Sequence, residues 1–102
     1  MASEFLHAPR ERLTKETIAL HQAITSVMEE LEAVDWYRQR TDDCDDDALK
    51  AILLHNMREE IEHACMGLEW LRRNSRDFDK ELRTYRFNDK DIVAAEHAAE
   101  HD

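Results

Sequence analysis

The fold of this chain is decided by residues 46–73, which read DDALKAILLHNMREEIEHACMGLEWLRR. Selected positions in this stretch recur at steps of three and four, which is the spacing of one face of an α-helix. That face carries Leu49, Leu53, Asn56, Glu60, His63, Gly67 and Leu71. The pattern therefore predicts a long helix whose buried line includes a carboxylate, Glu60, and an imidazole, His63.

A second helical pattern precedes it, over residues 14–40. Thr14 is a good N-cap, and Glu16 places a negative charge in the first turn. One apolar stripe has the same period and is formed by Leu20, Ile24, Val27, Leu31 and Val34. The run TDDCDDD, residues 41–47, separates the two helices, and its aspartates favour the positive end of the next helix. We therefore expect an antiparallel two-helix hairpin.

The rest of the chain divides into an arm and a tail. Residues 1–13 are polar and contain the only proline, so we expect an irregular N-terminal arm. The hairpin domain covers residues 14–87 and includes a short helix after residue 75, with an apolar face made of Phe78, Leu82 and Tyr85. Residues 88–102 are expected to form a weakly structured tail.

Composition limits the class of protein. The 102 residues include one glycine, one proline and 37% charged residues, which is typical of an all-α fold. A hairpin of this size buries little surface, so we expect it to self-associate. The net charge of −10 argues against nucleic acid and anionic membranes as partners and favours cations. The longest apolar run, residues 51–54, is too short to cross a bilayer, and two cysteines without metal-binding spacing indicate a reducing cytosol.

The spacing Glu-x-x-His is half of a metal site when both side chains lie on one helix face. With 13 glutamates and six histidines, about one such spacing arises by chance, and residues 4–7 are a second copy. The copy at residues 60–63 differs from a chance spacing because it has a partner in the first helix. Glu30, at the edge of the first stripe, lies about 15 residues before the turn, and Glu60 lies about 15 residues after it. At about 1.5 Å per residue, the two carboxylates stand at the same height.

Buried carboxylates need a compensating cation, and no Lys or Arg occupies a matching buried position. Carboxylate and imidazole ligands suit Fe, Mn or Zn. A Glu from each of two helices and Glu-x-x-His from each of two others form the di-iron pattern of helical bundles, and this chain holds half of it. A twofold homodimer would complete the site with two copies each of Glu30, Glu60 and His63.

Another face of the first helix carries Glu29, Glu32 and Trp36. An exposed Trp is unusual unless a second subunit covers it, whereas the glutamates alone are equally typical of a solvated face. His97 and His101 also have ligand spacing, but they lie in the polar tail, which favours a solvated helix end.

Several segments together resemble the encapsulated ferritins over residues 14–87. They are SVMEELEAVDWY at 26–37, His55-Asn56, Glu59-Glu60, Glu62-His63-Ala64, LEWLRR at 68–73 and LRTY at 82–85. The resemblance implies hairpin dimers that form ferritin-like four-helix bundles and assemble into a ring-shaped decamer. It also implies a ferroxidase that oxidises Fe(II) to Fe(III) with O2 at a di-iron centre between subunits, with two irons per dimer.

The resemblance assigns a role to each candidate residue. Glu30, Glu60 and His63 are the iron ligands. Tyr37 lies close to the metals, where it hydrogen-bonds a ligand, donates an electron or serves only as a packing aromatic. Glu29, Glu32 and Trp36 correspond to the positions where metal enters, at the contact between dimers. Ca²⁺ or another divalent cation is expected to bind there.

By the same resemblance, iron is delivered to an encapsulin nanocompartment in the bacterial or archaeal cytoplasm. Family members dock in this shell through a C-terminal peptide with a Gly-Ser-Leu core, and residues 98–102, AAEHD, do not contain one. Encapsulation is therefore expected from the family alone. Two alternatives stay open: a metal-free helical dimer that acts as a scaffold or adaptor, and a dimanganese or di-iron bundle that consumes peroxide.

Overall fold

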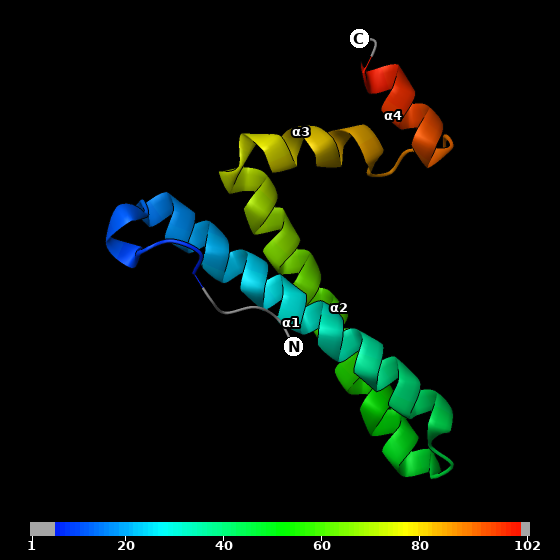
Figure 1. Ribbon diagram of the computed structural model, residues 1–102. Coiled ribbons are helices and arrows are strands. Elements are labelled where there is room, and N and C mark those ends of the chain that lie inside the picture. Colours follow the sequence, from blue (N-terminus) through cyan, green and yellow to red (C-terminus); the bar gives the residue numbers. More distant parts are fainter. Residues whose placement is uncertain (1–5, 101–102) are drawn as a thin grey trace.

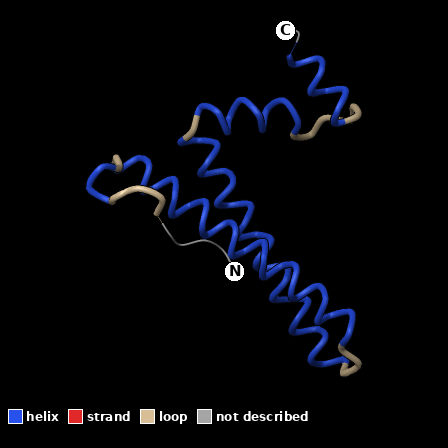
Figure 2. Tube along the Cα trace, in the orientation of Figure 1, coloured by secondary structure: helices blue, strands red, loops and turns tan. Residues whose placement is uncertain are grey.

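The computed structural model describes residues 6–100, and every regular element in that range is helical. A short 3₁₀ turn, Arg10–Arg12, precedes four α-helices. They are α1 (Lys15–Asp43), α2 (Asp47–Asn74), α3 (Arg76–Tyr85) and α4 (Ile92–Glu100). Figure 2 shows how little of the chain lies outside helices. The predicted all-α class is confirmed, while the chance Glu-x-x-His copy at residues 4–7 lies partly outside the described residues, as does His101.

Side-chain caps fix where the first three α-helices begin. Thr14 accepts a hydrogen bond from the Thr17 backbone N–H at 3.0 Å, and Asp46 accepts one from the Leu49 N–H at 2.8 Å. Ser75 accepts one from the Phe78 N–H at 3.3 Å. Each cap satisfies a backbone donor that the first turn leaves without a helical partner. The expected start of the first helix at Thr14 is therefore confirmed.

The turn of the hairpin is shorter than the sequence predicted. Helix α1 continues to Asp43, and only residues 44–46 separate it from α2. The Thr41 hydroxyl donates a hydrogen bond to the Tyr37 carbonyl at 2.7 Å, and Thr41 is buried. Burial of Thr41 keeps the backbone helical into the aspartate run, so tertiary packing overrides the helix-breaking tendency of that run.

Helices α1 and α2 pack against each other along an antiparallel seam, as Figure 1 shows. Its buried side chains are Val27 and Thr41 of α1, and Met57, Ala64 and Leu71 of α2. The seam therefore lies slightly to one side of the predicted buried lines. Four residues that were expected on those lines are exposed instead, namely Leu49 and His63 of α2 and Ile24 and Leu31 of α1. The reason is that each helix carries more apolar surface than one neighbouring helix can cover.

The hairpin is a thin structure, because the whole chain extends over 50 × 42 × 19 Å. The shortest dimension is less than two helix diameters, since a helix with its side chains is about 10–12 Å wide. In Figure 1 the two long helices lie together near the turn and diverge toward their open end. No helix within residues 6–100 is long and apolar enough to span a membrane.

Helix α3 crosses the end of α2, and in the described part of the chain it contacts α2 and α4 but not α1. The tail that was expected to be weakly structured contains α4, which packs on α3 and buries Ala95. The Asp91 carboxylate accepts a hydrogen bond from the Ala94 N–H at 3.0 Å. This cap and the alanine-rich sequence explain why the segment is helical.

Candidate metal centre

The carboxylate of Glu30 lies in the seam between α1 and α2. Its Oε2 atom is buried and has no hydrogen-bond partner among the described residues. Burial raises the pKa of the Glu30 carboxyl above its ordinary value, because the charged form loses hydration. The neighbouring His63 opposes this rise, whereas the negative charges of Glu60 and Glu29 add to it. Glu30 is thus a carboxylate in need of a cation.

Glu60 and His63 lie beside Glu30, at the boundary between the seam and the exposed surface. The Nδ1 atom of His63 stands 3.9 Å from Oε2 of Glu60, and the two side chains are 47% and 29% exposed. Both groups are close enough to Glu30 to shift its pKa. The structure therefore brings the three predicted ligands to one region, with Glu60 half-buried and His63 open to solvent.

One chain does not by itself complete a metal site. Between residues 6 and 100, no group of three or more Asp, Glu, His or Cys side chains is arranged so that it could hold a metal ion. The side chains of His63 and Glu60 are 47% and 29% exposed, so both are accessible from outside the chain. A metal ion held here would need ligands from a second molecule.

Glu59 is a residue of this region to which the sequence analysis assigned no role of its own. Its two carboxylate oxygens lie 3.7 Å from His55 Nε2 and 4.0 Å from His63 Nε2. The three residues follow at intervals of four, which places them in a row along one side of α2. That spacing is visible in the sequence and was the signal that could have found Glu59.

Tyr37 lies seven residues after Glu30 on the same side of α1 and is half-buried. Its ring packs under the Arg40 guanidinium, with 5.6 Å between the guanidinium carbon and the ring centroid. Seven residues correspond to about 10 Å along the helix, so within one chain Tyr37 is two turns from the Glu30 carboxylate. Its observed contacts are those of a packing aromatic.

Glu29, Glu32 and Trp36 share the side of α1 that faces away from α2, as predicted. Trp36 is 47% exposed, and the Arg40 guanidinium carbon lies 5.8 Å from the centroid of its ring. Glu29 is exposed and Glu32 half-buried. An exposed Trp flanked by carboxylates and held under a guanidinium is a feature of surfaces that other molecules cover.

Large apolar side chains stay uncovered on both sides of the candidate ligands. On α1 they are Ile24, Met28 and Leu31, and on α2 they are Leu49, Ile52, Met66 and Trp70. So many large exposed apolar side chains on a small chain are typical of surfaces that another molecule covers. Those of α2 lie on the same helix as Glu60 and His63.

A hairpin of two long helices that brings carboxylate and imidazole side chains together near its seam has the fold of a ferritin-like protein. The sequence profile of the EncFtn-like family matches residues 5–89. This chain therefore belongs to the EncFtn-like family, the encapsulated ferritins to which the sequence motifs pointed.

Individual relatives agree with this assignment. The chain is 56% identical over 97 residues to an encapsulated ferritin-like protein of Rhodospirillum rubrum, covering 95% of this chain and 69% of that protein. It is 47% identical over 96 residues to a ferritin-like protein of Thermotoga maritima, covering 94% of this chain and 83% of that protein. A crystal structure of a protein from Nitrosomonas europaea matches with a TM-score of 0.84 and 53% identity, covering 87% of this chain and 98% of that one.

Proposed function

We propose that this protein is a ferroxidase, which oxidises Fe(II) to Fe(III) with O2 at a di-iron site formed between two copies of the chain. The observation that carries the proposal is the buried Oε2 atom of Glu30, which has no hydrogen-bond partner among residues 6–100. A buried carboxylate without a partner is costly, and a divalent cation is the simplest compensation. Its neighbours Glu60 and His63 supply the other donors.

The donor set fits iron. Carboxylate and imidazole groups suit Fe(II), and a bundle of four helices that supplies four Glu and two His is the recognised di-iron pattern. A twofold pair of chains contributes two Glu30, two Glu60 and two His63. In this pair the Glu60 carboxylates would hold the two ions jointly, and Glu30 and His63 would supply the remaining ligands.

The protein groups have defined tasks in the reaction. Binding of Fe(II) would oppose the raised pKa of Glu30, because the cation stabilises the charged carboxylate. The four carboxylates would hold two Fe(II) ions together, and such a pair can supply two electrons to O2, giving two Fe(III) and, with two protons from solvent, one H2O2. Tyr37 lies about 10 Å along α1 from Glu30 within one chain, so a role in hydrogen-bonding a ligand or donating an electron requires that the second copy bring its Tyr37 closer to the centre.

The surrounding assignments follow from the family. The names of the relatives from R. rubrum and T. maritima support iron as the substrate, and the former supports storage inside an encapsulin compartment. Dimers assemble further into a ring-shaped decamer. Glu29, Glu32 and Trp36 take up Fe(II) at the contact between dimers, and Ca²⁺ or another divalent cation also binds there.

The test is an anaerobic Fe(II) titration of metal-free protein, followed by admission of air while ferric absorbance and oligomer mass are recorded. We expect saturation near one iron per chain, rapid oxidation, and loss of that oxidation in Glu60→Ala. No uptake and no rate above the buffer blank would contradict the proposal and favour a metal-free scaffold, which the uncovered apolar face would also suit. Faster turnover of H2O2 than of O2 would instead favour the peroxide-consuming bundle.

A further inference from the structure

The end of α2 and the start of α3 form an open cleft of about 700 Å³. Its charged lining consists of Arg72, Arg73, Arg76 and Arg83 against a single aspartate, Asp79. Four positive charges thus face one negative charge in a chain whose net charge is −10. The cleft is a local positive site on a negative protein.

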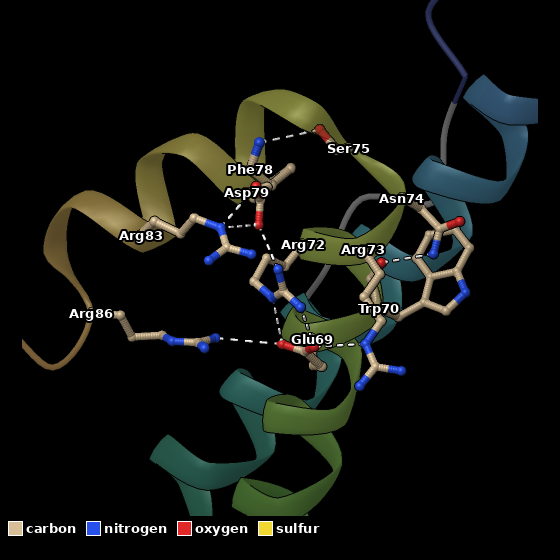
Figure 3. Close-up of polar contacts among 10 residues, drawn as sticks. All are labelled: Glu69, Trp70, Arg72, Arg73, Asn74, Ser75, Phe78, Asp79, Arg83 and Arg86. Atoms are coloured by element: carbon tan, nitrogen blue, oxygen red, sulfur yellow. Dashed lines mark hydrogen bonds and ion pairs between the residues drawn. The ribbon is translucent and has the colours of Figure 1, made fainter.

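Arg72 holds the two helices together at this cleft. Its Nε and one terminal nitrogen donate hydrogen bonds to Glu69, and its other terminal nitrogen donates to Asp79, as Figure 3 shows. The side chain is only 19% exposed. Because all three nitrogens are engaged, Arg72 ties α3 to the end of α2 and has a structural role.

Arg73 and Arg83 are each held by one nitrogen. Nε of Arg73 donates to Glu69 at 2.7 Å, and Nε of Arg83 donates to both oxygens of Asp79 at 2.9 and 3.0 Å. The terminal nitrogens of both side chains have no hydrogen-bond partner between residues 6 and 100, and each side chain is 69% exposed. Anchoring at Nε restricts the guanidinium groups while their terminal N–H donors stay open, which lowers the entropy cost of binding an anion.

Arg76 is the arginine of the cleft that the protein itself does not use. It is exposed, and in the described part of the chain it forms no ion pair. It is the first residue of α3, where the helix dipole is positive. Arg83 follows seven residues later on the same side of the helix, about 10 Å farther along its axis. The available guanidinium groups are therefore spaced along the cleft and are not gathered at one point.

We propose that this cleft binds an oligophosphate, an anion with phosphoryl groups at several points, such as tripolyphosphate. Each phosphoryl group offers several oxygens to guanidinium N–H donors, and these charge-assisted, bidentate hydrogen bonds are the strong ones. A single phosphate is too short to lie along both Arg76 and Arg83, whereas a row of phosphoryl groups matches their spacing. The site is independent of the proposed oxidation of iron, because none of its residues is a candidate iron ligand.

The charge of the rest of the chain restricts anion binding to this place. A net charge of −10 repels anions from the surface in general. The aspartate-rich turn, residues 42–47, lies at the other end of α2, about 40 Å away. At about 0.1 M salt, charges are screened beyond about 10 Å, so the turn does not cancel the positive charge of the cleft.

Binding is measured by isothermal titration calorimetry of tripolyphosphate into the metal-free protein at about 0.1 M salt. We expect one anion per chain, and binding about tenfold weaker in Arg76→Gln, because the loss of one charge-assisted hydrogen bond costs about a factor of ten. This change removes an unfavourable positive charge from the first turn of α3, so it does not impair folding. Arg76→Lys keeps the charge but not the planar group of donors, and should lie between Arg76→Gln and the parent chain.

Arg58→Gln is the matched control. Arg58 lies on α2 outside the cleft, is exposed and forms no ion pair with the residues that the structure describes, so its loss should leave binding unchanged. The absence of tripolyphosphate binding, or equal affinities of Arg76→Gln and Arg58→Gln, would overturn the site. Inorganic phosphate that binds as tightly as tripolyphosphate would contradict the extended ligand. Citrate that binds as tightly would contradict the choice of phosphoryl groups over carboxylates.

Discussion

Gly67 of α2 lies against Glu30 of α1: a Cβ atom at Gly67 would stand 3.8 Å from Glu30 Oε2 and 2.5 Å from Val27 Cγ2. The second distance is far too short for two carbon atoms, so the only glycine of the chain allows the helices to meet here. The close approach buries the Glu30 carboxylate and thereby creates its need for a cation. A packing detail and the candidate chemistry thus share one cause.

Gly67→Ala should destabilise the protein and slow iron oxidation. The added methyl group forces Val27 or the α1 backbone to move, which costs about 1–3 kcal/mol and exceeds the roughly 1 kcal/mol gained from helix propensity. Urea unfolding and the initial rate of Fe(II) oxidation are the measurements. Val27→Ala introduced into the same variant removes the clashing methyl group and should recover part of both losses. Equal or greater stability of Gly67→Ala alone would show that the seam has room at this point.

Glu30→Gln should stabilise the metal-free chain at neutral pH and abolish rapid iron oxidation. The folded-state pKa of Glu30 is raised above its ordinary 4.5, so the folded state holds this proton more tightly than the unfolded state. The contribution of Glu30 to the free energy of unfolding therefore falls as the pH rises from 4.5 to the raised pKa. Above that pKa the contribution stays unfavourable. The difference in unfolding free energy between Glu30→Gln and the parent chain, measured without metal from pH 4 to 8, should grow through that window. A difference that is independent of pH would contradict the buried, partnerless carboxylate.

The helices could be predicted from the sequence because their caps and apolar periods are local. Thr14, Asp46 and Ser75 each cap the helix that follows, and no long-range contact is needed to place them. The face that each helix turns inward was predicted less well. The sequence shows all apolar positions of α2 together, but only packing distinguishes Met57, which is buried by α1, from Leu49, which is left exposed.

The same limit applies to the candidate site. The spacing of Glu60 and His63 and the symmetric distance of Glu30 from the turn were sufficient to select these three residues. Glu59 was missed, although its spacing of four from both His55 and His63 is visible in the sequence, because only the structure shows its carboxylate close to both rings. The end of α1 at Asp43 was missed because it depends on burial of Thr41, which the aspartate-rich sequence around it conceals.

Asp79→Asn should loosen α3 from the end of α2. Hydrogen bonds from Arg72 and then Arg83 hold the pKa of the Asp79 carboxyl below its ordinary value, and those from Arg72 and Arg73 do the same for the pKa of Glu69. The stability from both groups is present above their ordinary pKa values and is lost as the pH falls through the lowered ones. Amide hydrogen exchange across residues 76–85 should therefore accelerate in Asp79→Asn at neutral pH. The matched change Asp77→Asn, two residues earlier in the same helix and without an ion pair in the described chain, should leave exchange nearly unchanged.

Glu59→Ala should slow iron oxidation about tenfold without preventing dimerisation. Glu59 lies 4.0 Å from Nε2 of His63, while Nδ1 of that ring stands 3.9 Å from Glu60, so carboxylates flank the imidazole on both sides. A carboxylate beside a ligand histidine restricts the orientation of its ring, and loss of such a partner typically lowers metal affinity or activity by about 10–100-fold. The readouts are the oxidation rate as a function of Fe(II) concentration and the iron stoichiometry, which should stay near one per chain.

Glu62→Ala removes the same charge from the next turn of α2 and serves as the control. A Glu59→Ala rate equal to that of Glu62→Ala would mean that Glu59 acts only through its charge, whereas a larger loss confined to Glu59→Ala would identify it as a positioning residue for His63.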